Sequence, residues 1–211
     1  MKTLKQRIWP VLAVVAALVW AAFPAHGALS ASQLLERCAD KLREAPSVSA
    51  RFTLSAPDGS RADGDILLSR ERFRLTTQGL RIWFDGRTQW TAYAATREVN
   101  ITEPTAEELL TGNPFAIITG YAGKYACRLL PGSGAVRDVE LTPHTAGGDI
   151  RKAVLSVDTR TLWPVRAVVT LSSGATVSAA IRDCATGGKP AASVFAFAAS
   201  ALPGYEIVDL R

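Results

Sequence analysis

The chain has 211 residues and a formal net charge of +5, and this length allows one domain with a sizeable apolar core. Three of the positive charges, on Lys2, Lys5 and Arg7, precede the first apolar run, and +5 − 3 leaves only +2 for the rest. No basic run interleaved with aromatic residues follows. The composition therefore gives weak support for nucleic-acid binding, and we expect no nucleic-acid partner.

Residues 1–27 have the pattern of a secretory signal peptide. After the basic start, Val11 to Phe23 is almost wholly apolar but short for a membrane span, and Ala25-His26-Gly27 offers small residues for cleavage. We predict a cleaved signal peptide over 1–27 and a single exported domain over 28–211, with an uncleaved N-terminal anchor as the alternative. The charged pair before Cys38 argues against a lipid-modified cysteine.

Three cysteines, Cys38, Cys127 and Cys184, follow the predicted signal peptide. An exported compartment permits a disulfide. Because Cys127 and Cys184 both fall in strand-like segments, they are the expected pair, and three buried free thiols are the alternative. Their spacing contains no CxxC motif and no metal-ligand pattern, so we expect neither a metal nor a cofactor.

The first predicted element of the exported part is an amphipathic helix from Ala31 to Glu44. Apolar side chains recur on one of its faces, and Pro46 ends it. Strand patterns follow over Val48–Ser55 and then within Gly64–Val99, where Asp85-Gly86 is the strongest hairpin signal. Strands at intervals of about ten residues without long helices between them predict an antiparallel meander.

Within Gly64–Val99 one face of the predicted sheet is apolar, because alternate residues of a strand point to the same side. The opposite face carries polar residues such as Asp65 and Arg74. Arg70 is a charged residue at the end of the first apolar strand. The apolar face comprises Ile66, Leu68, Phe73, Leu75, Leu80, Ile82, Phe84 and Trp90.

The meander is interrupted between Glu103 and Tyr121. Thr105 is predicted to cap a short helix, with Glu107 and Glu108 favourable in its first turn. Gly112-Asn113-Pro114 ends it and begins a second, apolar helical turn. Strands are then predicted over Lys124–Leu130, Val136–Leu141, Arg151–Asp158, Val165–Leu171 and Thr176–Cys184, and a short strand-like tail ends the chain.

Little in the sequence indicates catalysis. His144 is the one histidine after the predicted signal peptide, and it stands beside Pro143 in a turn-like segment. No nucleophile elbow, P-loop, dinucleotide fingerprint or metal-ligand cluster is visible. Glu107 and Glu108 are better explained by the helix dipole than by acid-base chemistry. We predict that the protein is not an enzyme.

The long apolar face needs a cover, and the candidate covers are small helices that can open at modest cost. An apolar pocket with a movable lid suits an acyl chain better than a polar metabolite, and an ordinary filled core is the alternative. A guanidinium on such a face needs acceptors, which helix-end carbonyls provide. Arg70 is therefore a candidate latch, that is, a side chain that holds the lid by hydrogen bonds. The alternative is that it extends to water.

Several short motifs stand in a characteristic order along the exported part. They are Gly64-Asp65-Ile66-Leu67-Leu68-Ser69-Arg70 with Phe73, Asp85-Gly86-Arg87-Thr88-Gln89-Trp90 with Tyr93, Gly112-Asn113-Pro114-Phe115, Phe195-Ala196-Phe197 and Pro203-Gly204. In order and spacing they resemble the LolA-like periplasmic carriers of outer-membrane lipoproteins. The resemblance implies a mainly β fold with short helices. The implied fold is a curved, incompletely closed antiparallel β-barrel (half-barrel) that is covered by a helical lid.

The resemblance also implies a function and partners. Such a carrier accepts lipoproteins from an inner-membrane ABC transporter that releases them. It carries their acyl chains through the periplasm to the outer membrane. The resemblance leaves open whether an outer-membrane acceptor receives them. The family's lid-holding arginine falls on Arg70. The family often has proline next, where this chain has Glu71, so Arg72 is an alternative latch. Arg70 is favoured because it shares a face with Ile66 and Leu68.

We therefore expect a monomeric carrier without enzymatic activity, whose apolar face contacts the acyl chains of the cargo. A periplasmic module that senses lipid or mislocalised lipoprotein with the same half-barrel is the main alternative. A small outer-membrane barrel is disfavoured by the short strands and the mid-chain helices. The residues expected to form the lid are Leu34, Leu35, Leu42, Phe115, Ile117 and Ile118.

Overall fold

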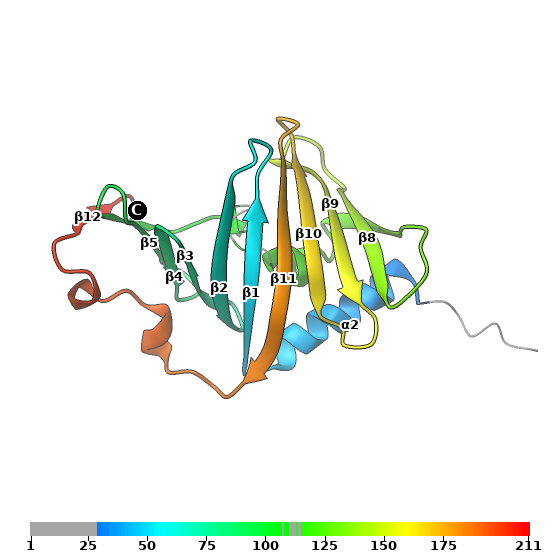
Figure 1. Ribbon diagram of the computed structural model, residues 1–211, viewed down its shortest axis with the longest axis horizontal. Helices are drawn as coiled ribbons and strands as arrows, with labels where there is room; N and C mark the ends of the chain where they lie inside the picture. Colours follow the sequence, from blue (N-terminus) through cyan, green and yellow to red (C-terminus); the bar gives the residue numbers. More distant parts are fainter. Residues whose placement is uncertain (1–28, 107, 110–112, 114) are drawn as a thin grey trace, which may run out of the picture. The chain divides into compact units, whose positions relative to one another are not determined.

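A twelve-stranded sheet is the framework of the part of the chain that the computed structural model describes, residues 29–106, 108, 109, 113 and 115–211 (Figure 1). Residues Ala31–Arg211 form one structural unit. The predicted signal peptide lies outside the described residues. The strands are β1 (Ser47–Ser55), β2 (Arg61–Ser69), β3 (Arg72–Thr77), β4 (Leu80–Phe84), β5 (Gln89–Tyr93), β6 (Glu98–Thr102), β7 (Tyr125–Leu129), β8 (Val136–Pro143), β9 (Ile150–Asp158), β10 (Pro164–Leu171), β11 (Thr176–Gly187) and β12 (Glu206–Asp209).

Two antiparallel meanders make up this sheet, as the alternating pattern predicted. Strands β1 to β6 form one and β7 to β11 the other, and β1 joins them by pairing with β11. The C-terminal strand β12 adds to β6 in parallel, so β12 and β7 are the two edges. Because these edges do not pair with each other, the sheet stays open. The predicted fold class, a mainly β and incompletely closed structure with short helices, is confirmed.

Helix α2 (Ala31–Glu44) has the predicted bounds and covers one face of the sheet. Its apolar face, which includes Leu35 and Cys38, is fully buried, and in Figure 1 the helix passes behind strands β8–β11. The short helix α4 (Ala116–Gly120) packs on α2, where the Tyr121 hydroxyl donates to the Ser32 carbonyl at 3.4 Å. We call the sheet face that meets these helices the inner face.

Gly64 allows close packing on the inner face between β1 and β2. It is paired with Phe52, and a Cβ at this position would lie 2.5 Å from that phenyl ring and 2.5 Å from the Thr76 carbonyl oxygen. Only glycine therefore lets the Phe52 ring lie across β2. Phe52 is fully buried and belongs to the core formed by the helices and the inner face.

The outer face of β3–β5 is covered by residues 188–205, which we call the C-terminal strap. This orange-to-red segment of Figure 1 contains the short 3-10 helices η1 (Ala192–Phe195) and η2 (Ala199–Ala201). The strap supplies Phe197, whose ring centroid is 5.5 Å from that of Trp83. A second apolar cluster results, formed by Trp83, Ala92 and Val99 with Trp90, Phe197, Leu202 and Tyr205.

Candidate functional site

An apolar cavity of about 580 Å³ opens on the inner face. This volume is within the usual range for sites that hold small molecules or lipid chains, about 300–1,000 Å³. Both meanders contribute to its wall, and its polar residues are Thr77 at the end of β3 and a group near the β10–β11 turn. The lining residues are Leu54, Leu75, Thr77, Leu80, Ile82, Asp149, Ala167, Val169, Leu171, Ser172, Ser173, Val177 and Ala179.

Three of the residues predicted to contact acyl chains line this cavity, namely Leu75, Leu80 and Ile82. The opposite wall, from β10 and β11, was not predicted. Part of the signal for this wall is present in the sequence, because Val169 and Leu171 are each followed by a polar residue, Thr170 and Ser172. What the sequence does not state is that β1 pairs with β11 and so brings the two walls together.

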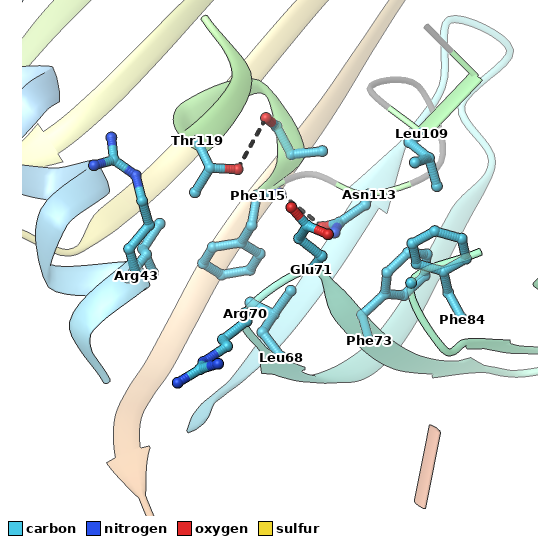
Figure 2. Close-up of a pocket in the computed structure, with 13 residues that line it drawn as sticks. Arg43, Leu68, Arg70, Glu71, Phe73, Phe84, Leu109, Asn113, Phe115 and Thr119 are labelled. Atoms are coloured by element: carbon cyan, nitrogen blue, oxygen red, sulfur yellow. Dashed lines mark hydrogen bonds between the residues drawn. The ribbon is translucent and has the colours of Figure 1, made fainter. Parts of the chain in front are cut away.

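A smaller cavity of about 260 Å³ lies beside the turn between β2 and β3, and we call it the turn cavity (Figure 2). Its apolar wall includes Leu68, Phe73 and Phe84 from the predicted apolar face, and Leu42 and Phe115 from the predicted lid. Phe73 and Phe84 pack with their ring centroids 5.4 Å apart. The other lining residues are Arg43, Arg70, Glu71, Gly86, Leu109, Asn113, Ala116 and Thr119.

Arg70 lies at this turn and not on the strand itself. Ser69 pairs with Arg72, so Arg70 and Glu71 form a two-residue loop, in which Arg70 has a left-handed backbone with φ of 58°. Its side chain is exposed, and with the described residues its guanidinium forms no hydrogen bond or ion pair. Arg43, across the turn cavity, is paired with Asp40 at 2.6 Å.

Arg72, the alternative latch, points away from both cavities. It is on the outer face, where its guanidinium lies 4.9 Å from the centre of the Phe195 ring in the C-terminal strap. Phe195 is fully buried. The cation–π contact therefore holds the strap against β3.

Five of the predicted site residues are packed inside the core and line neither cavity. They come from β2, α2 and the α4 region, and each is no more than 1% exposed. Their burial joins the helices to the sheet, which makes these contacts part of the core. These residues are Ile66, Leu34, Leu35, Ile117 and Ile118.

The placement of Trp90 on the apolar inner face was wrong. Phe84 pairs with Gln89 across a four-residue loop, and therefore Gln89 and Thr91 point inward while Trp90 points outward. Trp90 pairs with Trp83 and belongs to the cluster under the C-terminal strap. The inner face of β5 is thus polar where an aromatic residue was expected.

The segment between β6 and α4 starts with a capping box. The Thr105 hydroxyl accepts a hydrogen bond from the Glu108 amide at 3.3 Å, and the Glu108 carboxylate accepts one from the Thr105 amide at 2.7 Å. Asn113 was a predicted helix end, and its side-chain oxygen accepts a bond from the Phe115 amide at 2.9 Å (Figure 2). Glu107, Gly112 and Pro114 lie outside the described residues.

The thiols are free, and the expected bond between Cys127 and Cys184 is not formed. Cys127 is in β7 and Cys184 in β11, with three strands of the sheet between them. Burial, reinforced by nearby Cys184, raises the pKa of the Cys38 thiol to about 12, and burial raises that of Cys184 to about 11. These thiols are protonated at neutral pH and poorly nucleophilic.

The described residues include no cluster of three or more side chains that could bind a metal ion. Within the same part of the chain, no helix is both long and apolar enough to span a membrane. His144 lies exposed in the loop between β8 and β9.

A comparison with known protein families decides what this architecture is related to. The family described as "Outer membrane lipoprotein carrier protein LolA" matches residues 21–174, which is more than half of the chain. The chain belongs to this family. The resemblance inferred from the order of its motifs is therefore confirmed, and the LolA family consists of carriers and not of enzymes. None of the curated proteins matches the chain significantly.

Several solved structures are similar to this LolA-family protein, and one with a TM-score above 0.5 shows the same fold. An uncharacterized conserved protein from Thermus thermophilus has a TM-score of 0.56 at 11% identity, over 84% of this chain and 98% of that one. A LolA superfamily protein from Nitrosomonas europaea has a TM-score of 0.43 at 18% identity, over 81% of this chain and 99% of that one. The MucA/MucB complex of Pseudomonas aeruginosa has a TM-score of 0.45 at 20% identity, over 80% of this chain and 61% of that one.

Proposed function

We propose that this protein is a periplasmic carrier that binds the acyl chains of lipoproteins and shuttles lipoproteins from the inner to the outer membrane. The observation that carries the proposal is the apolar cavity of about 580 Å³ on the inner face, in a chain of the LolA family. Its walls, with residues such as Ile82 and Val169, match an acyl chain in chemistry. They offer few groups that could bind a polar metabolite.

Burial of methylene groups supplies the affinity in this proposal. Each fully buried methylene contributes about 0.8 kcal/mol. Ten of them would contribute about 8 kcal/mol before the cost of ordering the chain is subtracted, so a Kd near 1 μM requires at least this many. A carrier needs affinity of this order, because it must retain the chain in water and still release it to a membrane or an acceptor.

The helical segment beside the turn cavity is the proposed gate. Helix α4 has five residues, and the segment before it is held in part by local bonds around Thr105 and Asn113. A helix of five residues opens at lower free energy than the twelve-stranded sheet, and opening requires Phe115, Ile117 and Ile118 to leave the core. Arg70 stands at this place with a guanidinium that can donate to carbonyl groups of the segment, which is the latch role proposed for it. An inner-membrane ABC transporter is the proposed donor of the cargo.

Filling the cavity tests this proposal. Val169→Trp and Val177→Trp each place an indole in the apolar cavity, whereas Val136→Trp puts the same group on an exposed position of β8. Binding of a fluorescent long-chain fatty acid should weaken at least 10-fold in both cavity variants and stay within 2-fold in the control. Native mass spectrometry of the wild-type protein from periplasm should show co-purified lipid or lipoprotein.

The outcomes separate the possibilities clearly. Unchanged affinity in two cavity variants whose melting temperature matches the wild type would show that acyl chains do not bind in this cavity. Binding of the fatty acid without transfer of lipoprotein to outer-membrane vesicles would contradict the shuttle and leave a lipid-binding module.

A further inference from the structure

The inner face changes from apolar to polar between β4 and β5. Strand pairing defines rows of side chains that lie next to one another across the sheet. One row reads Leu75, Ile82, Thr91 and Asn100 from β3 to β6, so the change falls between Ile82 and Thr91. The neighbouring rows are Phe73, Phe84, Gln89 and Thr102, and Thr77, Leu80, Tyr93 and Glu98.

Six inner-face side chains come from β5 and β6, and five of them line one cavity, whereas Glu98 does not. We call these five the polar shelf; they are Gln89, Thr91, Tyr93, Asn100 and Thr102. They form the floor of a separate cavity of about 500 Å³. Segments that follow β6 and the C-terminus make its rim, with residues Glu103, Pro104, Glu108, Leu210 and Arg211.

The polar groups of the shelf are largely unused inside the protein. The Gln89 amide donates to the Thr91 hydroxyl at 3.2 Å. Within the described part of the chain, the side chains of Asn100 and Thr102 have no hydrogen-bond partner. Both are half-buried beside the cavity, so a ligand that enters can bind to these donors and acceptors.

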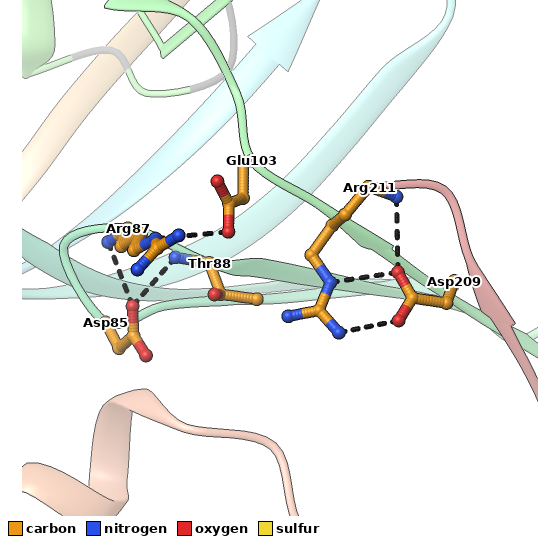
Figure 3. A network of polar contacts seen from close by, with 6 residues as sticks. All are labelled: Asp85, Arg87, Thr88, Glu103, Asp209 and Arg211. Atoms are coloured by element: carbon orange, nitrogen blue, oxygen red, sulfur yellow. Dashed lines mark hydrogen bonds and ion pairs between the residues drawn. The ribbon is translucent and has the colours of Figure 1, made fainter.

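Two of the charged rim residues, Glu103 and Arg211, form ion pairs with residues outside the cavity lining (Figure 3), and the Glu108 carboxylate accepts hydrogen bonds from Thr105. Arg87 lies 3.1 Å from the Glu103 carboxylate, and Arg211 lies 2.6 Å from that of Asp209. The floor itself carries amide and hydroxyl groups only. This combination favours a ligand with uncharged carbonyl and N–H groups over an ion, because the side chains of the floor itself offer hydrogen-bond donors and acceptors without charge.

We propose that the polar shelf binds the peptide segment next to the acylated end of a lipoprotein, while the acyl chains occupy the apolar cavity. This inference rests on the proposed carrier function. Ile82 and Leu80 line the apolar cavity, and their cross-strand neighbours Thr91 and Tyr93 belong to the shelf. An amphipathic ligand can therefore extend from one site to the other without leaving the sheet. The shelf selects lipopeptides over other acylated molecules.

Three probes with equal acyl chains test the shelf: a synthetic lipopeptide with a short uncharged peptide, a fatty acid and a diacylglycerol. Thr91→Val removes the hydroxyl at constant size, and Asn100→Leu removes the amide. The double variant should bind the lipopeptide about 10-fold more weakly, as expected for the loss of two hydrogen bonds, and the other two probes within 2-fold of the wild type. Thr170→Val, on a half-buried β10 position outside both cavities, is the control.

Each other result overturns the inference in a recognisable way. An unchanged lipopeptide affinity in the double variant would exclude the shelf while leaving the carrier function intact. Equal weakening of the diacylglycerol would mean that the shelf binds ester groups and not peptide. If the wild type bound none of the three probes, both the carrier function and the shelf would fail. Thermal melting of each variant separates loss of binding from loss of fold.

Discussion

Arg70 combines an unfavourable backbone conformation with a place at a cavity. A residue with a side chain at a φ of 58° is strained by about 1–3 kcal/mol, and glycine would relieve that strain. An arginine at such a turn is therefore not explained by the stability of the hairpin. Arg70 lines the turn cavity together with Phe115, so a role of the guanidinium at that cavity would explain an arginine at this position.

Arg70→Gly separates function from stability. We expect the melting temperature to stay equal or to rise, because the turn loses strain, while the transfer of lipoprotein falls at least 10-fold because the guanidinium is gone. Transfer from inner-membrane vesicles to outer-membrane vesicles measures the function, and circular dichroism measures the melting.

Arg97→Gly provides a matched control, since Arg97 has a φ of 57° in the turn between β5 and β6. It should transfer lipoprotein like the wild type. Normal transfer by Arg70→Gly would remove this arginine from the proposed gate.

The Cys38 thiol makes the stability of the fold sensitive to alkaline pH. Its pKa is raised from an ordinary 9.0 to about 12 by burial. Below pH 9 the thiol is neutral in both states and its contribution to stability is fully present. Between pH 9 and about 12 the unfolded chain ionises first, and this contribution is lost as the pH rises.

Cys38→Ala should therefore flatten the alkaline side of the stability profile. In reducing buffer, the wild type should lose about 1.4 kcal/mol between pH 8 and pH 10 through this group, and the variant should lack that loss. Urea unfolding at the two pH values measures it. Cys127→Ala, at a half-buried position, should keep most of the loss. A variant with the same alkaline loss as the wild type would exclude Cys38 as its source.

Among the secondary-structure elements, the C-terminal strap holds the outer face of the first meander. Phe195 in η1 is fully buried against β3 and β4, beneath the Arg72 guanidinium. We expect Phe195→Ala to lower the free energy of unfolding by about 3–5 kcal/mol. Phe197→Ala, at a half-buried position, should have a smaller effect. Urea titration measures both, and equal small effects would show that the strap is not part of the stable fold.

The hairpin between β4 and β5 shows where a sequence pattern misleads. Alternation within each strand was interpreted correctly for β2, β3 and β4, because Phe73 and Leu75 pair with Phe84 and Ile82. The error at Trp90 came from the loop, since its length decides which face the next strand presents. The polar shelf was missed for the same reason, although Thr91 and Asn100 were visible in the sequence.

Local signals predicted the elements well. Helix α2 has the predicted bounds because its apolar face and the following proline both indicate its end, and Thr105, predicted as a capping residue from its type and position, accepts a hydrogen bond from the Glu108 amide. The parallel pairing of β12 with β6 could not be predicted in this way. No local pattern specifies a partner that is about a hundred residues away.

At the scale of the whole molecule, the apolar cavity exists because the two meanders are joined in one sheet. One wall of the apolar cavity comes from β3 and β4 and the other from β10 and β11. Either meander alone has only a sheet with one apolar face. The alternation of apolar and polar residues predicts that face, but it does not predict which strands join the two meanders. The cavity therefore depends on strand pairing that alternation does not encode, and only Leu75, Leu80 and Ile82 of its thirteen lining residues were predicted.

The pairing of β1 with β11 also determines how late in synthesis the sheet can be completed. Ser47 pairs with Gly187, so the join cannot form until nearly the whole chain has been made. Contacts between residues so far apart in sequence slow folding, and until then β1 is an unpaired edge that can pair with other chains. The newly made chain is thus slow to acquire its native state, and during that time its open strand edges expose it to aggregation.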